Sequence, residues 1–256
     1  MITQNIRNLV SQIIVECDIL DAQAPAPSPA PITFVDCLAG IVPPATNMYA
    51  DELAETAWLN ARNTYRTTMK NAPNGSIVFI GDSMIERGNF STISTRAVNL
   101  GISGESIRQL IYRINEADIN NQQNLIRRAG AVVILTGVND LSDTRNGTPA
   151  NAAATVNFVY DRLVNWASGK VILCKVIPVD STVFSVPTNA SIQLVNDRIQ
   201  SYATKPYVKI VDVGSTLAPN GTLLPQYHVD GQHLSTAGYD VLKAVIKTKL
   251  QEFQVI

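Results

Sequence analysis

The chain has 256 residues, 46% of them hydrophobic and 16% charged, which is enough apolar sequence to bury the core of one medium-sized domain. Twenty Lys and Arg residues stand against twenty-one Asp and Glu residues, which leaves a net charge of -1 without any dense basic run. This balance argues against nucleic acid or an anionic membrane surface as a partner and favours a neutral or weakly charged substrate.

The first segment of the chain has the composition of an appendage. Charged residues interrupt the moderately apolar residues 1–20, so we read no signal peptide and no membrane span there, and we expect a cytoplasmic protein or a component of a phage particle. Residues 24–31 alternate Ala or Ser with Pro, which predicts an extended, semi-rigid spacer. Residues 1–45 are therefore predicted to be an N-terminal appendage that serves self-association or attachment to a larger assembly.

A long helix is predicted over residues 47–70, because acidic residues come early and basic residues late in this segment, the order that complements a helix dipole. We interpret residues 46–74 as a helical lead-in to a domain that occupies residues 75–256. In that domain apolar, strand-like runs alternate with amphipathic helical runs. Strands are predicted at residues 77–80, 97–100, 131–135, 171–179 and 208–213, and helices around residues 107–114, 156–163, 192–202 and 241–250.

Strands that are apolar throughout and alternate with helices are typical of a parallel sheet covered on both faces. The sequence therefore predicts an α/β fold of three α/β/α layers, built on a doubly wound, flavodoxin-like sheet of five parallel strands. In such a sheet the carboxyl ends of the strands share one edge, and ligands bind there. The residues that directly follow the strands are the first candidates for a functional site.

Ser83 follows the first predicted strand, in the segment Gly81-Asp82-Ser83-Met84. A serine that a glycine-containing turn delivers to a strand end can be approached by substrate, so Ser83 is a candidate nucleophile. For this short segment alone, a plain turn without chemistry is the alternative interpretation.

His228 and His233 are the two histidines of the chain. In Asp230-Gly231-Gln232-His233 a carboxylate stands three residues before an imidazole, a separation that lets the carboxylate accept a hydrogen bond from Nδ1 and leaves Nε2 to take a serine proton. His228 has Pro225 at the equivalent position, so no such partner is expected for it. For Asp230 and His233 alone, an exposed loop histidine near a helix start is the alternative.

Two further residues are candidate donors to an oxyanion. Asn139, in Gly137-Val138-Asn139-Asp140, follows the third predicted strand and can donate from its side-chain amide. Gly101 follows the second predicted strand and can offer a backbone N–H with no side chain in the way. Each feature alone is equally typical of a simple turn or bend.

Together these segments resemble the four blocks of the SGNH hydrolases, also called the GDSL family, in its acetylhydrolase-like branch. The blocks match Gly81-Asp82-Ser83-Met84, Asn99-Leu100-Gly101, Gly137-Val138-Asn139-Asp140 and Asp230-Gly231-Gln232-His233, within a resemblance over about residues 75–252. The resemblance implies that Ser83 is the nucleophile, that His233 is the general base and then acid, and that Asp230 orients it. It also implies an oxyanion hole made of the backbone N–H groups of Ser83 and Gly101 with the Asn139 side chain.

The sequence thus predicts a serine esterase that needs no metal and no cofactor and hydrolyses a carboxylic ester through an acyl-enzyme. Low aromatic content, 6%, and the lack of a long apolar lid favour O-acetyl groups on a carbohydrate as substrate. A lipid acyl ester or a thioester is the alternative within enzymes, and acyl transfer to an acceptor other than water stays open. From another class, the fold could serve as a binding module tethered to a larger assembly such as a phage tail.

Overall fold

The computed structural model of the protein describes residues 55–256 except 111, 114–127, 143–149, 151–152, 155, 158–159, 161–163 and 165–168. The predicted appendage, residues 1–45, and the first part of the predicted lead-in lie outside the described residues. In the described part of the chain no helix is both long and apolar enough to cross a membrane.

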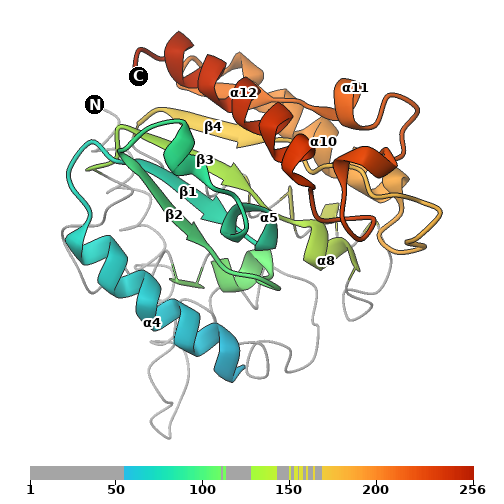
Figure 1. Ribbon diagram of the computed structural model, residues 1–256, viewed down its shortest axis with the longest axis horizontal. Coiled ribbons are helices and arrows are strands. Elements are labelled where there is room, and N and C mark those ends of the chain that lie inside the picture. The colour runs from blue at the N-terminus through green and yellow to red at the C-terminus, as the bar shows by residue number, and fades with distance from the viewer. Residues whose placement is uncertain are drawn as a thin grey trace, which may run out of the picture. The chain divides into compact units, whose positions relative to one another are not determined.

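A sheet of five parallel strands forms the centre of the domain, in the order β2-β1-β3-β4-β5 (Figure 1). The strands are β1 (Ile77–Gly81), β2 (Ala97–Gly101), β3 (Ala131–Leu135), β4 (Val171–Cys174) and β5 (Val208–Val211). The chain passes from β1 to β2 and then returns past β1 to β3, so the strand order reverses at β1. In such sheets ligands bind beyond the carboxyl ends of the strands at this point of reversal. The predicted three-layer α/β/α fold is confirmed.

Helices lie on both sides of this sheet, with α4 facing one side and α12 the other (Figure 1). Their bounds are α4 (Thr56–Asn71), α5 (Ser83–Glu86), α8 (Val138–Ser142), α10 (Asn189–Ser201), α11 (Gly214–Leu217) and α12 (Thr236–Glu252), with short 3-10 helices η1 (Phe90–Thr92), η3 (Tyr202–Thr204) and η4 (Pro225–Tyr227). The described residues of the two other predicted helices, within 107–113 and 153–164, are also helical.

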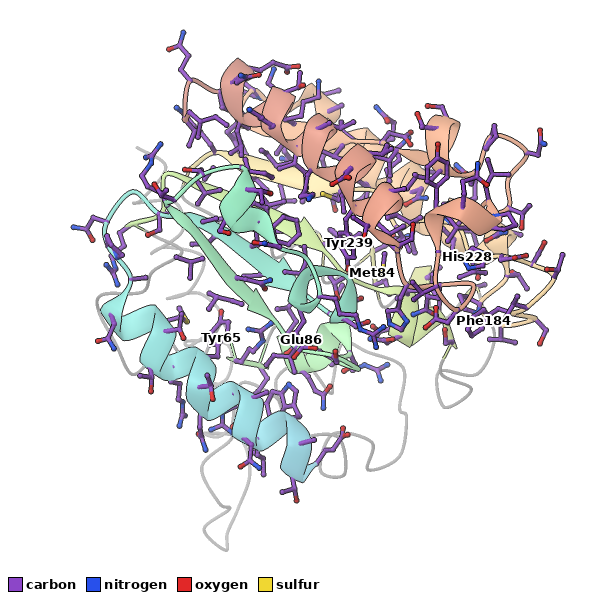
Figure 2. All side chains as sticks on the ribbon, in the orientation of Figure 1. Tyr65, Met84, Glu86, Phe184, His228 and Tyr239 are labelled. Atoms are coloured by element: carbon purple, nitrogen blue, oxygen red, sulfur yellow. The ribbon has the colours of Figure 1, made fainter. Side chains whose placement is uncertain are left out.

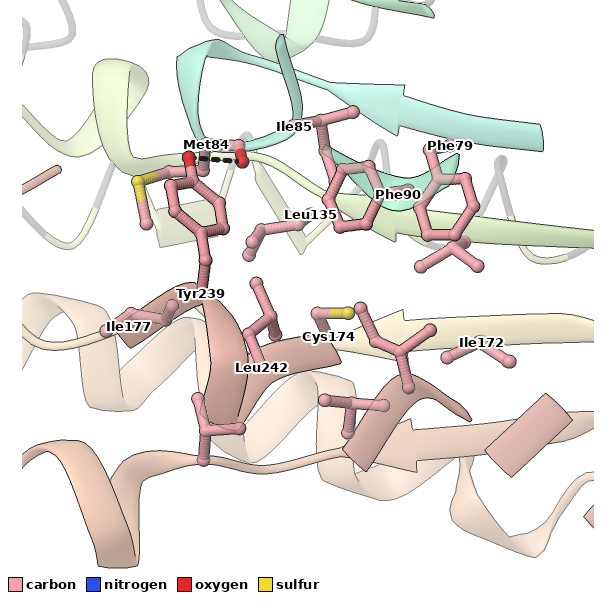
Figure 3. Packing of buried hydrophobic residues seen from close by; sticks show 14 of the residues in the cluster. Phe79, Met84, Ile85, Phe90, Leu135, Ile172, Cys174, Ile177, Tyr239 and Leu242 are labelled. Atoms are coloured by element: carbon pink, nitrogen blue, oxygen red, sulfur yellow. Dashed lines mark hydrogen bonds between the residues drawn. The ribbon is translucent and has the colours of Figure 1, made fainter. Parts of the chain in front are cut away.

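Side chains along β1 point alternately to the two faces of the sheet, so one strand contributes apolar side chains to both faces. Ile77 and Phe79 belong to a cluster with Leu242 and other apolar residues of α12, and the ring of Phe79 stacks on that of Phe90 at 4.1 Å between centroids (Figure 3). Val78 is buried as well but is not part of that cluster. The strand is therefore apolar at every position, as a sheet covered on both faces requires.

Helix α4, within the predicted lead-in, packs against the rest of the domain. Its residues Trp58, Tyr65 and Met69 are buried, and the Trp58 indole N–H donates to Glu105 Oε1 at 2.9 Å. The guanidinium of Arg128 donates to the carbonyl of Met69 at 2.8 Å. The predicted helix is thus present from Thr56 onward.

The fourth and fifth strands are shorter than predicted. β4 ends at Cys174 instead of Val179, because the backbone N–H groups of Val176 and Val179 donate to the side chains of Asn196, at 2.8 Å, and Asn189, at 2.9 Å. These side-chain acceptors replace a neighbouring strand, so the segment leaves the sheet with its hydrogen bonds satisfied. β5 ends at Val211, two residues before the predicted limit.

Candidate active site

A tight turn places Ser83 at the carboxyl end of β1, where the strand order reverses. Gly81 has φ +152°, and a Cβ at this position would lie 1.8 Å from the carbonyl oxygen of Leu135, so no other residue fits. Asp82 then caps helix α5, because its Oδ1 accepts from the backbone N–H of Met84 at 2.9 Å. Ser83 becomes the first residue of α5 and is 3% exposed.

The structure joins Ser83, His233 and Asp230 in one chain of hydrogen bonds. Ser83 Oγ lies 2.9 Å from His233 Nε2, and His233 Nδ1 lies 2.6 Å from Asp230 Oδ2. Since the carboxylate accepts a hydrogen bond from Nδ1–H, the other ring nitrogen, Nε2, is left to accept the serine hydroxyl proton. The arrangement is the one that activates a hydroxyl for nucleophilic attack.

Asp230 is held in its charged form by the turn that it starts. Partial burial alone would raise its pKa, but hydrogen bonds from the His233 backbone N–H and imidazole and from the Gln232 backbone N–H lower the pKa to about 2. The two backbone contacts to Oδ1 measure 2.8 Å from His233 and 3.0 Å from Gln232. The carboxylate can therefore stabilise a positive charge on the imidazole at neutral pH.

Asn139 lies at the carboxyl end of β3, in the first turn of α8, as the sequence predicts. Its Nδ2 donates to the backbone carbonyl of Glu105 at 3.0 Å. This contact uses one N–H of the amide group and fixes its orientation, while the amide has a second N–H to offer.

Gly101 does not have the free backbone N–H that the sequence analysis assigned to it. This N–H donates to Asn99 Oδ1 at 2.9 Å, so it is already engaged. Glycine is required there for packing instead, because a Cβ at Gly101 would lie 2.2 Å from the backbone nitrogen of Glu86 in α5. The amide of Asn99 strengthens the same junction by donating to the carbonyl of Ile85 at 2.7 Å.

Gly104, three residues further on, is a glycine that the sequence analysis missed. It has φ +75°, with no neighbouring heavy atom within 4 Å of an ideal Cβ. It immediately precedes Glu105, whose carbonyl holds the Asn139 amide, and no hydrogen bond engages its backbone N–H within the described residues. The positive-φ turn beside Asn139 is the signal that points to this residue.

A fully buried ion pair lies beneath this side of the site and was also missed. Arg113 Nε and Nη2 donate to Glu105 Oε1 and Oε2, both at 2.6 Å, and Nη2 also donates to the carbonyl of Leu100 at 2.8 Å. The guanidinium lies 4.0 Å from the ring centroid of Tyr65, which points from α4 toward the sheet (Figure 2). The sequence signal is the position of Arg113, three residues after Leu110 on the apolar face of its helix.

His228 has a carboxylate partner, contrary to the prediction. Its Nε2 lies 3.1 Å from Asp180 Oδ2, and its Nδ1 accepts from the backbone N–H of Gly231 at 2.8 Å. The partner comes from the loop after β4, which no local spacing around Pro225 could indicate. Phe184, a residue of the same loop as Asp180, packs against the turn that follows His228, because a Cβ at Gly231 would lie 3.0 Å from its ring (Figure 2).

Helix α12 is tied directly to the turn that carries the serine. The hydroxyl of Tyr239 donates to the backbone carbonyl of Met84 at 2.9 Å (Figure 3).

In the part of the chain that the structure describes, no group of three or more His, Cys, Asp or Glu side chains could hold a metal ion.

Known proteins resemble this chain in sequence and in fold. A sequence profile of the GDSL-like lipase/acylhydrolase family matches residues 72–241. A solved GDSL-like lipase from Bacteroides thetaiotaomicron is 25% identical, with a TM-score of 0.60, over 76% of this chain and 98% of that one. A proposed acylhydrolase from Bacteroides fragilis is 23% identical, with a TM-score of 0.59, over 76% of this chain and 97% of that one.

The catalytic domain of a peptidoglycan O-acetyltransferase from Streptococcus pneumoniae, solved with a methylsulfonyl adduct, has the same fold. It is 19% identical, with a TM-score of 0.51, over 71% of this chain and 95% of that one. No curated protein matches the chain. Because the family profile covers well over half of the sequence, the chain belongs to the GDSL-like lipase/acylhydrolase family, a family of ester hydrolases.

Proposed function

We propose that this enzyme is a serine esterase in which Ser83 attacks the carbonyl carbon of a carboxylic ester and forms an acyl-enzyme. The observation that carries the proposal is the chain of contacts from Ser83 Oγ to His233 Nε2, 2.9 Å, and from His233 Nδ1 to Asp230 Oδ2, 2.6 Å. A nucleophile, a base and a group that orients the base are the elements of this chemistry.

In both half-reactions the proton passes through His233 Nε2. As the bond from Ser83 Oγ to the carbonyl carbon forms, His233 Nε2 takes the hydroxyl proton, and Asp230 stabilises the imidazolium. The proton then passes to the oxygen of the departing alcohol as the ester C–O bond breaks. Water repeats these steps on the acyl-enzyme and releases the acid, which regenerates the Ser83 hydroxyl.

We assign the oxyanion hole to the backbone N–H groups of Ser83 and Gly104 and to the side chain of Asn139. Ser83 starts helix α5, where backbone N–H groups have no partner within the helix. Gly104 takes the place predicted for Gly101, whose N–H is already bonded to Asn99. Donors of this kind stabilise the charge that develops on the carbonyl oxygen in the transition state.

For the substrate we propose O-acetyl groups on a carbohydrate. The low aromatic content of the chain, 6%, supports this choice over a long acyl chain. A cavity of about 10 Å³, which is room for about one water-sized group, adjoins the serine turn. It is lined by Asp82, Met84, Leu135, Thr136, Val138, Val176, Ile177 and Gln232. The O-acetyltransferase domain with this fold supports the same class of acyl group.

Hydrolysis of 4-nitrophenyl acetate and octanoate by the wild-type enzyme and by Ser83→Ala tests the proposal. We expect the wild type to prefer acetate and Ser83→Ala to lose activity on both esters. Unchanged activity in Ser83→Ala would remove the assignment of the nucleophile, and a preference for octanoate would remove the acetyl assignment. Acetate release from a panel of acetylated glycans, with and without a glycan acceptor, then separates hydrolysis from transfer.

A further inference from the structure

A second carboxylate–imidazole pair lies beside the proposed catalytic one. Asp180, in the loop after β4, and His228, directly after η4, are in contact at 3.1 Å, and their side chains are only 9% and 12% exposed. Because His228 Nδ1 accepts the Gly231 N–H at 2.8 Å, the proton of the neutral ring is on Nε2 and is donated to Asp180. The neutral ring therefore uses both of its nitrogens.

These contacts hold the turn of residues 228–233 against the loop after β4. The backbone N–H of Asp180 donates to the carbonyl of Gly231 at 2.7 Å. Gly231 has φ +92°, and a Cβ there would lie 2.8 Å from the Cβ of Val183, so the two backbones pack closely. Asp180 is itself fixed, because its Oδ1 accepts from the N–H of Thr182 at 2.9 Å and from its hydroxyl at 2.7 Å.

Asp230 lies inside this turn, between the two residues that the pair holds. His228 precedes it by two residues, and Gly231 follows it directly. The turn closes with a hydrogen bond from the Val229 N–H to the carbonyl of His233 at 2.9 Å. The position of the proposed base and of its carboxylate therefore depends on where His228 is held.

We propose that Asp180 and His228 are positioning residues for the reaction, which act through Asp230 and His233 without contacting Ser83. This inference rests on the proposed function. A misplacement of about 1 Å in a reacting group can cost about 100-fold in rate. We therefore expect loss of the pair to lower kcat more than it raises KM.

Three variants test this proposal on 4-nitrophenyl acetate. His228→Ala removes both contacts, and His228→Asn keeps an acceptor for the Gly231 N–H but loses Asp180. Asp240→Asn is the matched control, since Asp240 is an exposed carboxylate of α12 that pairs with Lys243 at 2.9 Å. We expect kcat to fall between about 10- and 100-fold in His228→Ala, less in His228→Asn and not at all in Asp240→Asn, with KM within about twofold of the wild type.

A double-mutant cycle separates positioning from a general structural role. If His228 acts through Asp230, then His228→Ala should cost less than about twofold in kcat when Asp230 is already Ala. If His228→Ala lowered kcat by the same factor with Asp230 and with Ala at position 230, the proposal would be overturned. A wild-type kcat in folded His228→Ala, or a loss confined to KM, would also overturn it.

Failure of a variant to fold and failure of the proposed function can both be told apart from failure of the positioning role. If His228→Ala does not fold, Asp180→Asn, which preserves side-chain volume, and His228→Asn, which removes less of the side chain, carry the same test. If Ser83→Ala keeps wild-type activity, the proposed function fails, whereas full activity in the His228 variants alone removes only the positioning role.

Discussion

The buried pair of Glu105 and Arg113 allows the largest stability effect to be worked from the structure. Glu105→Gln keeps the size of the side chain but removes its charge, so the guanidinium of Arg113 stays buried without a counter-charge. Both side chains are 0% exposed, and two contacts of 2.6 Å join them. Removing one partner of such a pair costs about 3–5 kcal/mol in the free energy of unfolding.

Urea unfolding followed by circular dichroism measures this loss in free energy, and thermal unfolding measures the matching fall in Tm. For a domain of this size, each kcal/mol lowers Tm by roughly 2–4 °C, so Glu105→Gln should unfold roughly 6–20 °C below the wild type. The matched control is Glu252→Gln, because the exposed Glu252 pairs with Lys249 at 2.6 Å and with Lys209 at 3.5 Å. Loss of these surface pairs should cost less than about 1 kcal/mol.

A second substitution checks the stated cause. Adding Arg113→Met to Glu105→Gln removes the unpaired charge and should recover part of the lost stability. If Glu105→Gln cost no more than Glu252→Gln, the pair would be worth no more than a surface pair, and the reasoning would be refuted.

Two other predictions concern the serine turn and the oxyanion hole. Asn139→Ala should lower kcat on 4-nitrophenyl acetate by about 100-fold or more. The control Ser142→Ala, at the far end of α8, should leave kcat at the wild-type value. Equal kcat values in the two variants would contradict the role of Asn139. Burial raises the pKa of Asp82 from 3.8 to about 7, so between these values the folded state holds a proton that the unfolded state has released. The free energy of unfolding should therefore fall as pH rises from about 4 to about 7, and Asp82→Asn should flatten this slope in urea titrations; parallel slopes would exclude the raised pKa.

Features that depend on local spacing could be predicted from the sequence. Apolar runs of strand length locate β1, β3 and β4, because a sheet covered on both faces buries each residue of its inner strands. The contact between Asp230 and His233 follows from three residues of separation on a turn. Ser83 lies at a strand end because a glycine that tolerates positive φ precedes it by two residues.

Features that depend on contacts between distant segments could not be predicted. Asp180 and His228 are 48 residues apart, and nothing near either residue indicates the other. The choice between Gly101 and Gly104 as a backbone donor depends on where the Asn99 side chain turns. The early end of β4 likewise depends on side chains of α10 that take over its backbone hydrogen bonds.

Covalent labelling of the full chain with a sulfonyl fluoride, followed by peptide mass mapping, tests the central claim most directly. We predict that the label attaches to the hydroxyl of Ser83, that ester hydrolysis stops in proportion to labelling, and that Ser83→Ala takes up no label. A label on another residue, or full hydrolytic activity after Ser83 is completely modified, would contradict the account.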